Sequence, residues 1–273
     1  MIEKILFPVD FSLSSAAMAA DVKRVSGMFG SEVTLVHVCD LESHNGFELY
    51  LRSFQEIGEE HWNLARSKLD SFLLSEFPPA KHPRLLRSGE AAAQIAEAAR
   101  TGEFDLIVMP THAGRFRQML LGSTTAKVLN DADCLVMTTE HAETVAPRPL
   151  ERRKWVCAIG LSSDSERVLR LAGRAAAQVG AKLSVIHVVR GSAATGEEKS
   201  ARGRLSELLT TAGCEATVHI ASGPVKEALL ETARRSEADA LIIGRKPRSG
   251  PLGRMRDLTY AVVRDSPFPV LSV

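Results

Sequence analysis

The sequence predicts an α/β protein of two tandem domains, each a five-stranded parallel sheet with helices on both faces. The chain has 273 residues, and at about 150 residues per domain this length suggests two domains. The two halves repeat the same motifs in the same order. Within each half, short apolar runs alternate with helix-like stretches, which is typical of parallel strands joined by right-handed helical crossovers.

The internal repeat rests on matched apolar blocks. Val33–Val38 (VTLVHV) matches Leu183–Val188 (LSVIHV), and Asp105–Met109 matches Asp239–Ile243. The spacing between the two blocks is larger in the first half, so that half carries a longer segment between residues 37 and 89. A repeat of this kind predicts two copies of one structural unit.

Each unit contains strands and helices in the order β-α-β-α-β-α-β-α-β. The strands are short aliphatic or β-branched runs, as expected of strands buried on both faces. In the first half they are Ile5–Val9, Val33–Val38, Arg84–Arg87, Leu106–Met109 and Leu135–Thr138. The helices between them are Ser14–Phe29, Tyr50–Phe77, Ala91–Thr101 and Thr124–Asp131. The strands of the second half are Trp155–Ile159, Leu183–Val188, Ala216–Ile220, Ala240–Ile243 and Val270–Ser272.

The domain boundaries follow from these elements. The first domain is predicted at residues 1–140 and the second at 154–273, with a linker at 141–153 where Pro147, Pro149 and mixed charges interrupt any pattern. Exposed edges, such as those of the final strands Leu135–Thr138 and Val270–Val273, favour pairing on general grounds. Whether two chains then form a homodimer is left open.

The composition limits the kinds of partner that the protein is expected to bind. Lys and Arg number 34 against 33 Asp and Glu, for a net charge of +1, so no global field attracts nucleic acid. No apolar run approaches the roughly 20 residues of a membrane span, and the N-terminal apolar stretch is too short for a secretory signal. The four cysteines form no C-x-x-C pair. Buried free thiols suit a reducing compartment, so we expect a cytoplasmic protein without nucleic-acid or membrane partners.

Ligands of open parallel sheets bind beyond the carboxyl ends of the strands, where the strand order reverses. Pro8, Val9 and Asp10 follow the first predicted strand. The Asp10 carboxylate is able to accept a hydrogen bond from a ribose hydroxyl or a base amine. It is equally able to cap the helix that begins near Ser12, and the sequence leaves both interpretations open.

The segment after the fourth strand is long and basic. Residues 110–125 contain His112, Arg115 and Arg117 but no acidic residue. Their last part, Gly122-Ser123 at a helix start, suits backbone N–H groups that bind phosphates. The alternative interpretation makes Gly122 a turn residue and Ser123 an ordinary N-cap, with the arginines in solvent.

Several blocks together resemble the universal stress protein family. They are Ile5–Ser12 (ILFPVDFS), Leu35–Val38 (LVHV), Leu106–His112 (LIVMPTH), Leu120–Ser123 (LLGS) and Lys127–Leu129 (KVL). The resemblance covers nearly the whole chain as two tandem copies. It implies a Rossmann-like fold of the adenine nucleotide alpha hydrolase type and a role in the cytoplasmic stress response. It also implies pairing through the final strands, which would join the two halves into an internal pseudo-dimer. In many members it also implies bound ATP, with Mg²⁺ only where ATP is bound, and no dedicated catalytic machinery.

The same resemblance suggests site residues. It assigns the adenosine part to Asp10 and Val38, and the phosphates to a G-x2-G-x9-G-S/T loop. This chain departs from the loop, because Pro110 and Ala113 replace its first two glycines and the spacing to Gly122 is one residue short. Proline offers no N–H and alanine adds a Cβ, so binding is expected to be weaker unless Gly114 takes over the close approach. The candidate nucleotide-binding residues are Pro8, Val9, Asp10, Val38, Met109, Pro110, Gly114, Gly122, Ser123 and Thr124.

The second half departs further from the pattern. Gly160 stands where the first half has Asp10, and Arg256-Asp257 stands where it has Gly122-Ser123. An aspartate there would repel phosphate. The favoured function is therefore an ATP-binding regulatory module of the stress response, with the nucleotide in the first half. The alternative is an interaction scaffold that binds no nucleotide, and ATP hydrolysis is expected to be slow at most because the loop offers no identifiable general base.

Overall fold

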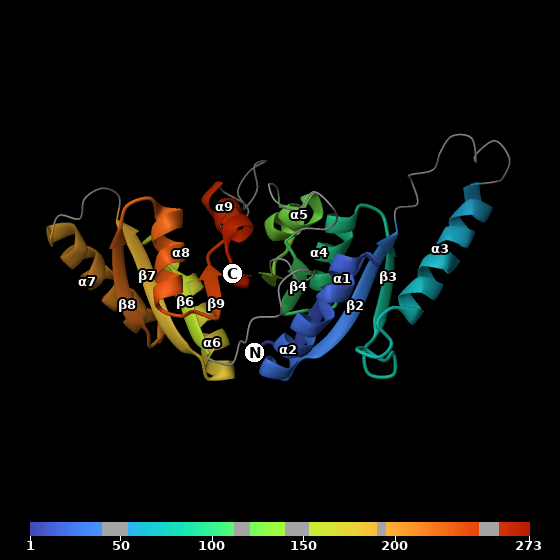
Figure 1. Cartoon of the computed structure of the whole chain (residues 1–273), viewed down its shortest axis with the longest axis horizontal. Helices are drawn as coiled ribbons and strands as arrows, with labels where there is room; N and C mark the ends of the chain where they lie inside the picture. Colours follow the sequence, from blue (N-terminus) through green and yellow to red (C-terminus); the bar gives the residue numbers. More distant parts are fainter. Residues whose placement is uncertain (40–53, 112–120, 140–152, 190–194, 246–256) are drawn as a thin grey trace.

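The strands of both halves join in one sheet. A computed structural model describes residues 1–39, 54–111, 121–139, 153–189, 195–245 and 257–273. It contains a ten-stranded sheet in the order β3-β2-β1-β4-β5-β10-β9-β6-β7-β8 (Figure 1). The first five strands in this order belong to the first half and the last five to the second half. The predicted α/β fold class with two tandem units is confirmed, and the two five-stranded sheets are continuous with each other.

The strands lie within two residues of the bounds that the sequence predicts. Those of the first half are β1 (Lys4–Pro8), β2 (Glu32–Cys39), β3 (Arg84–Ser88), β4 (Leu106–Pro110) and β5 (Leu135–Thr139). Those of the second half are β6 (Lys154–Ala158), β7 (Lys182–Val189), β8 (Thr217–Ser222), β9 (Ala240–Ile243) and β10 (Val270–Ser272). Neighbouring strands within each half are parallel. Strands β5 and β10 pair antiparallel, with Leu271 opposite Met137, so the final strand of each half joins the other.

The helices alternate with these strands. In the first half they are α1 (Leu13–Ala17), α2 (Ala19–Phe29), α3 (Phe54–Ser71), α4 (Ala91–Thr101) and α5 (Ser123–Asp131). In the second half they are α6 (Ser165–Val179), α7 (Thr195–Ala212), α8 (Val225–Arg235) and α9 (Asp257–Asp265). Helices α3 and α7 are both 18 residues long. The extra residues of the first half therefore lie in the connections on either side of α3.

Two predicted helices differ from the structure. The expected helix Ser14–Phe29 is two helices that meet at Met18, which lies outside both and caps each of them. The expected helix Tyr50–Phe77 ends at Ser71, because Leu73 adopts a positive φ of 53° and the chain turns there. This turn brings the buried Phe77 ring to 5.9 Å from the ring of Phe7 on β1. Residues 50–53 lie outside the described part of the chain.

Helices cover both faces of the sheet, and each face has one core that runs through both halves. Helices α2, α3, α6 and α7 bury their apolar residues on one face, and α4, α5, α8 and α9 bury theirs on the other. Each core contains buried residues from both halves. Burial of a continuous apolar core disfavours separation of the halves.

Polar and aromatic contacts also join the two halves at the amino ends of the strands. The ring of Phe29 on α2 lies 6.2 Å from the ring of Trp155 on β6. The Gln178 side chain on α6 accepts from the Ile2 backbone N–H at 2.8 Å and donates to the carbonyl oxygens of Ile2 and Phe29, each at 3.0 Å. The junction therefore consists of more than the β5–β10 pair. Across the described helices, none has the length and apolarity needed to cross a membrane.

Candidate functional site

The strand order of the first half reverses between β1 and β4. These strands are hydrogen-bonded neighbours, and the chain continues from β1 to β2 on one side and from β4 to β5 on the other. Pro8, Val9 and Asp10 lie at the carboxyl end of β1, and Met109 and Pro110 end β4. Loops at such a reversal diverge and leave room for a ligand. The structure thus brings the residues predicted after these two strands to one place in the fold.

Asp10 organises the start of α1. The backbone N–H and the hydroxyl of Ser12 donate to Asp10 Oδ1 at 3.0 and 2.5 Å, and the Ser15 hydroxyl donates to the same oxygen. Ser12 is the N-cap of α1 and accepts from the Ser15 N–H. Of the two interpretations, direct capping by Asp10 is therefore wrong, because Ser12 occupies the cap and Asp10 orients it.

The Asp10 carboxyl group is held in its charged form. Partial burial opposes ionisation, but hydrogen bonds from Ser12 and Ser15 outweigh it and hold the pKa below its ordinary value. All of these bonds reach Oδ1, so Oδ2 accepts no hydrogen bond from the described residues. An ionised carboxylate oxygen with an open lone pair suits a ligand hydroxyl or amine donor.

His37 on β2 supports this loop and acts as a structural residue. Its Nδ1 lies 2.7 Å from the Val9 carbonyl oxygen, and its ring stacks at 4.2 Å on Phe11, which has a positive φ of 61°. Burial lowers the His37 pKa, which favours the neutral ring. In the parts of the chain that the structure describes, no group of three or more His, Cys, Asp or Glu is placed to hold a metal ion.

Val38 and Gly89 mark the carboxyl ends of the outer strands. Val38 is partly buried on β2 and pairs with Arg87 on β3. Gly89 has a positive φ of 122° and donates its N–H to the Cys39 carbonyl oxygen at 3.1 Å. Only glycine adopts this backbone conformation easily, so the turn into α4 requires it.

The start of α5 differs from the expected cap. Gly122 is the N-cap without a side-chain hydrogen bond, and Ser123 is the exposed first residue of the helix. The expectation that Ser123 caps the helix is therefore wrong. The backbone N–H groups of Ser123 and Thr124 have no partner within the described residues, and such groups at a helix start attract anions. Gly114, His112, Arg115 and Arg117 lie outside the described residues.

Pro110 is compatible with its place although it departs from the family loop. It ends β4, where it pairs with Thr139, and its carbonyl oxygen accepts from the Thr125 hydroxyl on α5 at 3.0 Å. The Gly122 N–H donates to the Thr111 carbonyl oxygen at 2.9 Å. Thr111 and Thr125 thus fix the start of α5 to the end of β4. Sequence reasoning missed both residues, because hydroxyl-to-backbone bonds leave no pattern in the sequence.

A salt bridge also holds α5 beside α4. Glu90 is the N-cap of α4, accepts from the Ala93 N–H at 2.7 Å and meets Lys127 Nζ at 3.0 Å. Both side chains are about half exposed, so the pair contributes at most about 1 kcal/mol. Its effect is mainly to orient the two helices.

The second half keeps the geometry of the loop but lacks the carboxylate. His187 Nδ1 lies 2.7 Å from the Ile159 carbonyl oxygen, and Leu161 has a positive φ of 51°, as Phe11 has in the first half. Gly160 provides no side chain to bind a ligand, and α9 begins at Asp257. Arg256 lies outside the described residues. Both halves therefore have the same turn after their first strand, but the second half lacks the acidic group.

Comparison with known proteins agrees with the pattern of motifs. The model of the family described as "Universal stress protein family" matches residues 1–139 and 151–273. The chain belongs to the universal stress protein family. The resemblance of the sequence motifs to this family is thereby confirmed.

Solved structures share the complete fold. A universal stress protein from Archaeoglobus fulgidus has a TM-score of 0.74 at 21% identity, over 100% of this chain and 98% of that one. A putative universal stress protein from Pseudomonas aeruginosa has a TM-score of 0.66 at 18% identity, over 100% of this chain and 93% of that one. At these identities the likeness establishes the fold.

One curated relative shares only a segment. The sensor protein KdpD of Mycobacterium tuberculosis is 38% identical over 99 residues, which are 36% of this chain and 11% of that protein. The match therefore spans a small part of the sensor.

Proposed function

We propose that this universal stress protein binds an adenine nucleotide in its first half and acts as a regulatory module. The observation that carries the proposal is the ionised Asp10 carboxylate, with Oδ2 open, at the reversal of strand order between β1 and β4. In this arrangement Asp10 would accept a ribose hydroxyl, and Val38 would contact the adenosine part. Between Asp10 and Val38, the ligand would pack against Pro8, Val9 and Met109.

The phosphates would lie at the start of α5. The open N–H groups of Ser123 and Thr124 and the helix dipole favour negative charge there. Pro110 offers no N–H, so we expect weaker binding than in family members with an intact glycine loop. Mg²⁺ would enter with ATP, coordinated by the phosphates.

We propose regulation rather than catalysis. Residues 110–125 include no Asp or Glu, so the phosphate loop lacks a carboxylate to act as general base. Slow ATP hydrolysis is the most that this site is expected to support, and product formation over hours tests it.

One observation favours the alternative of a scaffold without nucleotide. The N–H of Leu121, immediately before Gly122, already donates to Tyr260 Oη of the second half at 3.2 Å. If this bond serves only the junction, the start of α5 is a structural contact.

Calorimetric titration with ATP separates the two functions. The Asp10→Asn variant retains an acceptor oxygen for Ser12 and Ser15 but removes the charge. Loss of a hydrogen bond to a charged group predicts about tenfold weaker binding or more. The matched control is Gly160→Ala at the equivalent position of the second half, where an added Cβ meets nothing within 4 Å.

Two outcomes oppose the proposal at different levels. No heat from the wild type at millimolar ATP would exclude the nucleotide and favour the scaffold. Unchanged affinity in Asp10→Asn would leave binding intact but refute the assigned site.

We further propose a cytoplasmic protein. Cys39, Cys134, Cys157 and Cys214 are all free thiols, which suits a reducing compartment. Whether two chains associate is tested by light scattering during size-exclusion chromatography.

A further inference from the structure

We propose that the second half positions the helix of the first half that binds phosphate, with Tyr260 and Arg245 as the positioning residues. The inference rests on the proposed function, because it concerns the same site. It assigns a task to the half that lacks the aspartate. The two residues hold opposite ends of α5.

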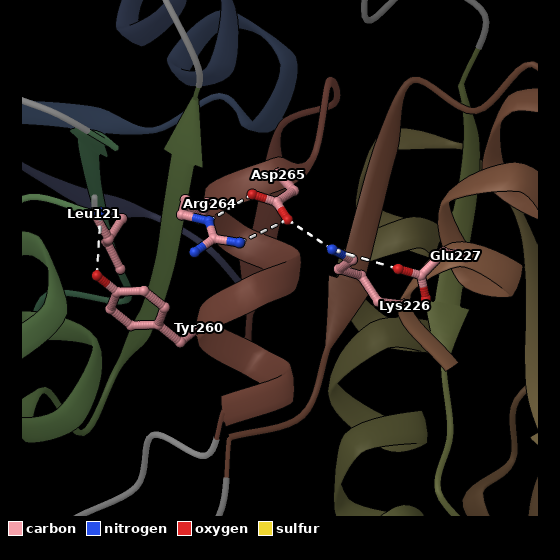
Figure 2. A network of polar contacts seen from close by, with 6 residues as sticks. All are labelled: Leu121, Lys226, Glu227, Tyr260, Arg264 and Asp265. Carbon is pink, nitrogen blue, oxygen red and sulfur yellow. Dashed lines mark hydrogen bonds and ion pairs between the residues drawn. The ribbon is translucent and has the colours of Figure 1, made fainter. Parts of the chain in front are cut away.

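Tyr260 holds the entry to α5. It is half-buried on α9, and its hydroxyl oxygen accepts from the Leu121 N–H at 3.2 Å (Figure 2). Leu121 is 5% exposed and directly precedes the N-cap Gly122. Since the first turn of α5 has no side-chain cap, this bond from the other half helps to fix where its open N–H groups point.

Helix α9 is anchored well enough to support this contact. Figure 2 shows Asp265 on α9 between Arg264 and Lys226. Arg264 donates to both carboxylate oxygens at 2.6 and 2.9 Å, and Lys226 on α8 donates to Oδ2 at 2.9 Å. The Lys226 bond fastens α9 to α8 and the Arg264 bonds hold the carboxylate in place, so Tyr260 projects from a supported helix.

Arg245 holds the other end of α5. It follows β9 and is 3% exposed. Its guanidinium group donates to the carbonyl oxygens of Leu129 and Ala132 at 2.8 and 3.0 Å, and to that of Cys134. The last carbonyl groups of a helix lack partners within the helix, and a cation there is favourable. Arg245 therefore completes the C-terminal end of α5 across the junction.

The contacts that position α5 have no counterpart at α9 of the second half. The repeat aligns Arg245 with Thr111 and Tyr260 with Ala126. The Thr111 hydroxyl donates to Thr139 within its own half at 3.3 Å, and alanine has no side-chain hydrogen-bonding group. The second half thus holds α5, whereas the equivalent residues of the first half make no such contact with α9.

The decisive experiment compares ATP with adenosine by calorimetry. Tyr260→Phe removes only the hydroxyl group. We expect it to weaken ATP binding about fivefold, as for one lost hydrogen bond, and to leave adenosine binding unchanged because adenosine has no phosphates. The matched control is Gln178→Met, which removes the cross-half bonds to Ile2 and Phe29 at the opposite end of the strands. It should change neither affinity.

Hydrogen–deuterium exchange without ligand provides the second measurement. In Tyr260→Phe and Arg245→Met, the amides of α5 should exchange faster than in the wild type. In Gln178→Met they should exchange at the wild-type rate.

The outcomes separate this inference from the proposed function. If the wild type binds ATP and Tyr260→Phe binds it equally well, positioning by Tyr260 is refuted and the nucleotide site stands. If Gln178→Met weakens ATP binding as much as Tyr260→Phe does, any loosening of the junction has the effect, and specific positioning is again refuted. If the wild type binds no ATP, both proposals are overturned.

Discussion

Replacement of Arg245 by methionine is expected to lower the free energy of unfolding substantially. Its guanidinium group is buried at 3% exposure and donates to three carbonyl oxygens of the other half. Methionine fills the volume of the alkyl stem but donates no hydrogen bond to these carbonyl oxygens. Each bond to a charged donor contributes about 1.5–3 kcal/mol, but removal of a buried cation also relieves its desolvation, so we expect a net loss of about 2–4 kcal/mol.

Urea denaturation measures this loss. The chain has two tryptophans, Trp62 on α3 of the first half and Trp155 on β6 of the second, so intrinsic fluorescence reports on both halves. The matched control is Arg170→Met, because Arg170 is 46% exposed and pairs with Glu166 one helical turn away. That pair contributes about 0.3–0.5 kcal/mol.

The comparison of the two variants tests the reasoning. Arg245→Met should shift the urea midpoint clearly further than Arg170→Met, and exchange at the C-terminal end of α5 should rise. Equal midpoints for the two variants would show that the buried guanidinium adds no net stability and would refute the argument.

Three further predictions concern other parts of the molecule. Hydrogen bonds from Arg264 and Lys226 lower the pKa of Asp265 from an ordinary 3.8 to about 2. The stabilising effect of the ionised carboxylate is therefore complete above about pH 4 and is lost as the pH falls toward 2. Asp265→Asn should show a smaller fall in urea midpoint between pH 5 and pH 3 than the wild type. A Cβ at Gly244 would lie 2.8 Å from Val168 Cγ2, so Gly244→Ala should cost about 1–3 kcal/mol in urea denaturation, and an unchanged midpoint relative to Gly160→Ala would contradict this. Burial raises the pKa of the Cys157 thiol, so iodoacetamide at pH 8 should modify Cys157 in urea but not in the folded protein, as mass spectrometry would show.

Local pattern was sufficient to predict the elements. Strands such as β2 and β7 are apolar runs with β-branched residues, which is the pattern of parallel strands covered on both faces of a sheet. Asp10 was predicted for the site because it follows the first strand, and parallel strands bring their carboxyl ends to one edge. Val38 was assigned only by the resemblance to the family. The predictions failed where non-helical backbone geometry decides, at the positive φ of Leu73 and at the cap of α5.

The sequence by itself determined two copies of an α/β unit, their order of elements and the half that retains an acidic residue at the site. The tertiary structure added the antiparallel register of β5 and β10 that makes the two sheets one, and it alone showed that Tyr260 and Arg245 hold α5. The hydrogen bonds concerned join residues 139 and 116 positions apart. Such contacts have no periodicity and no local spacing, because they arise only when β5 and β10 pair and bring the ends of distant helices together.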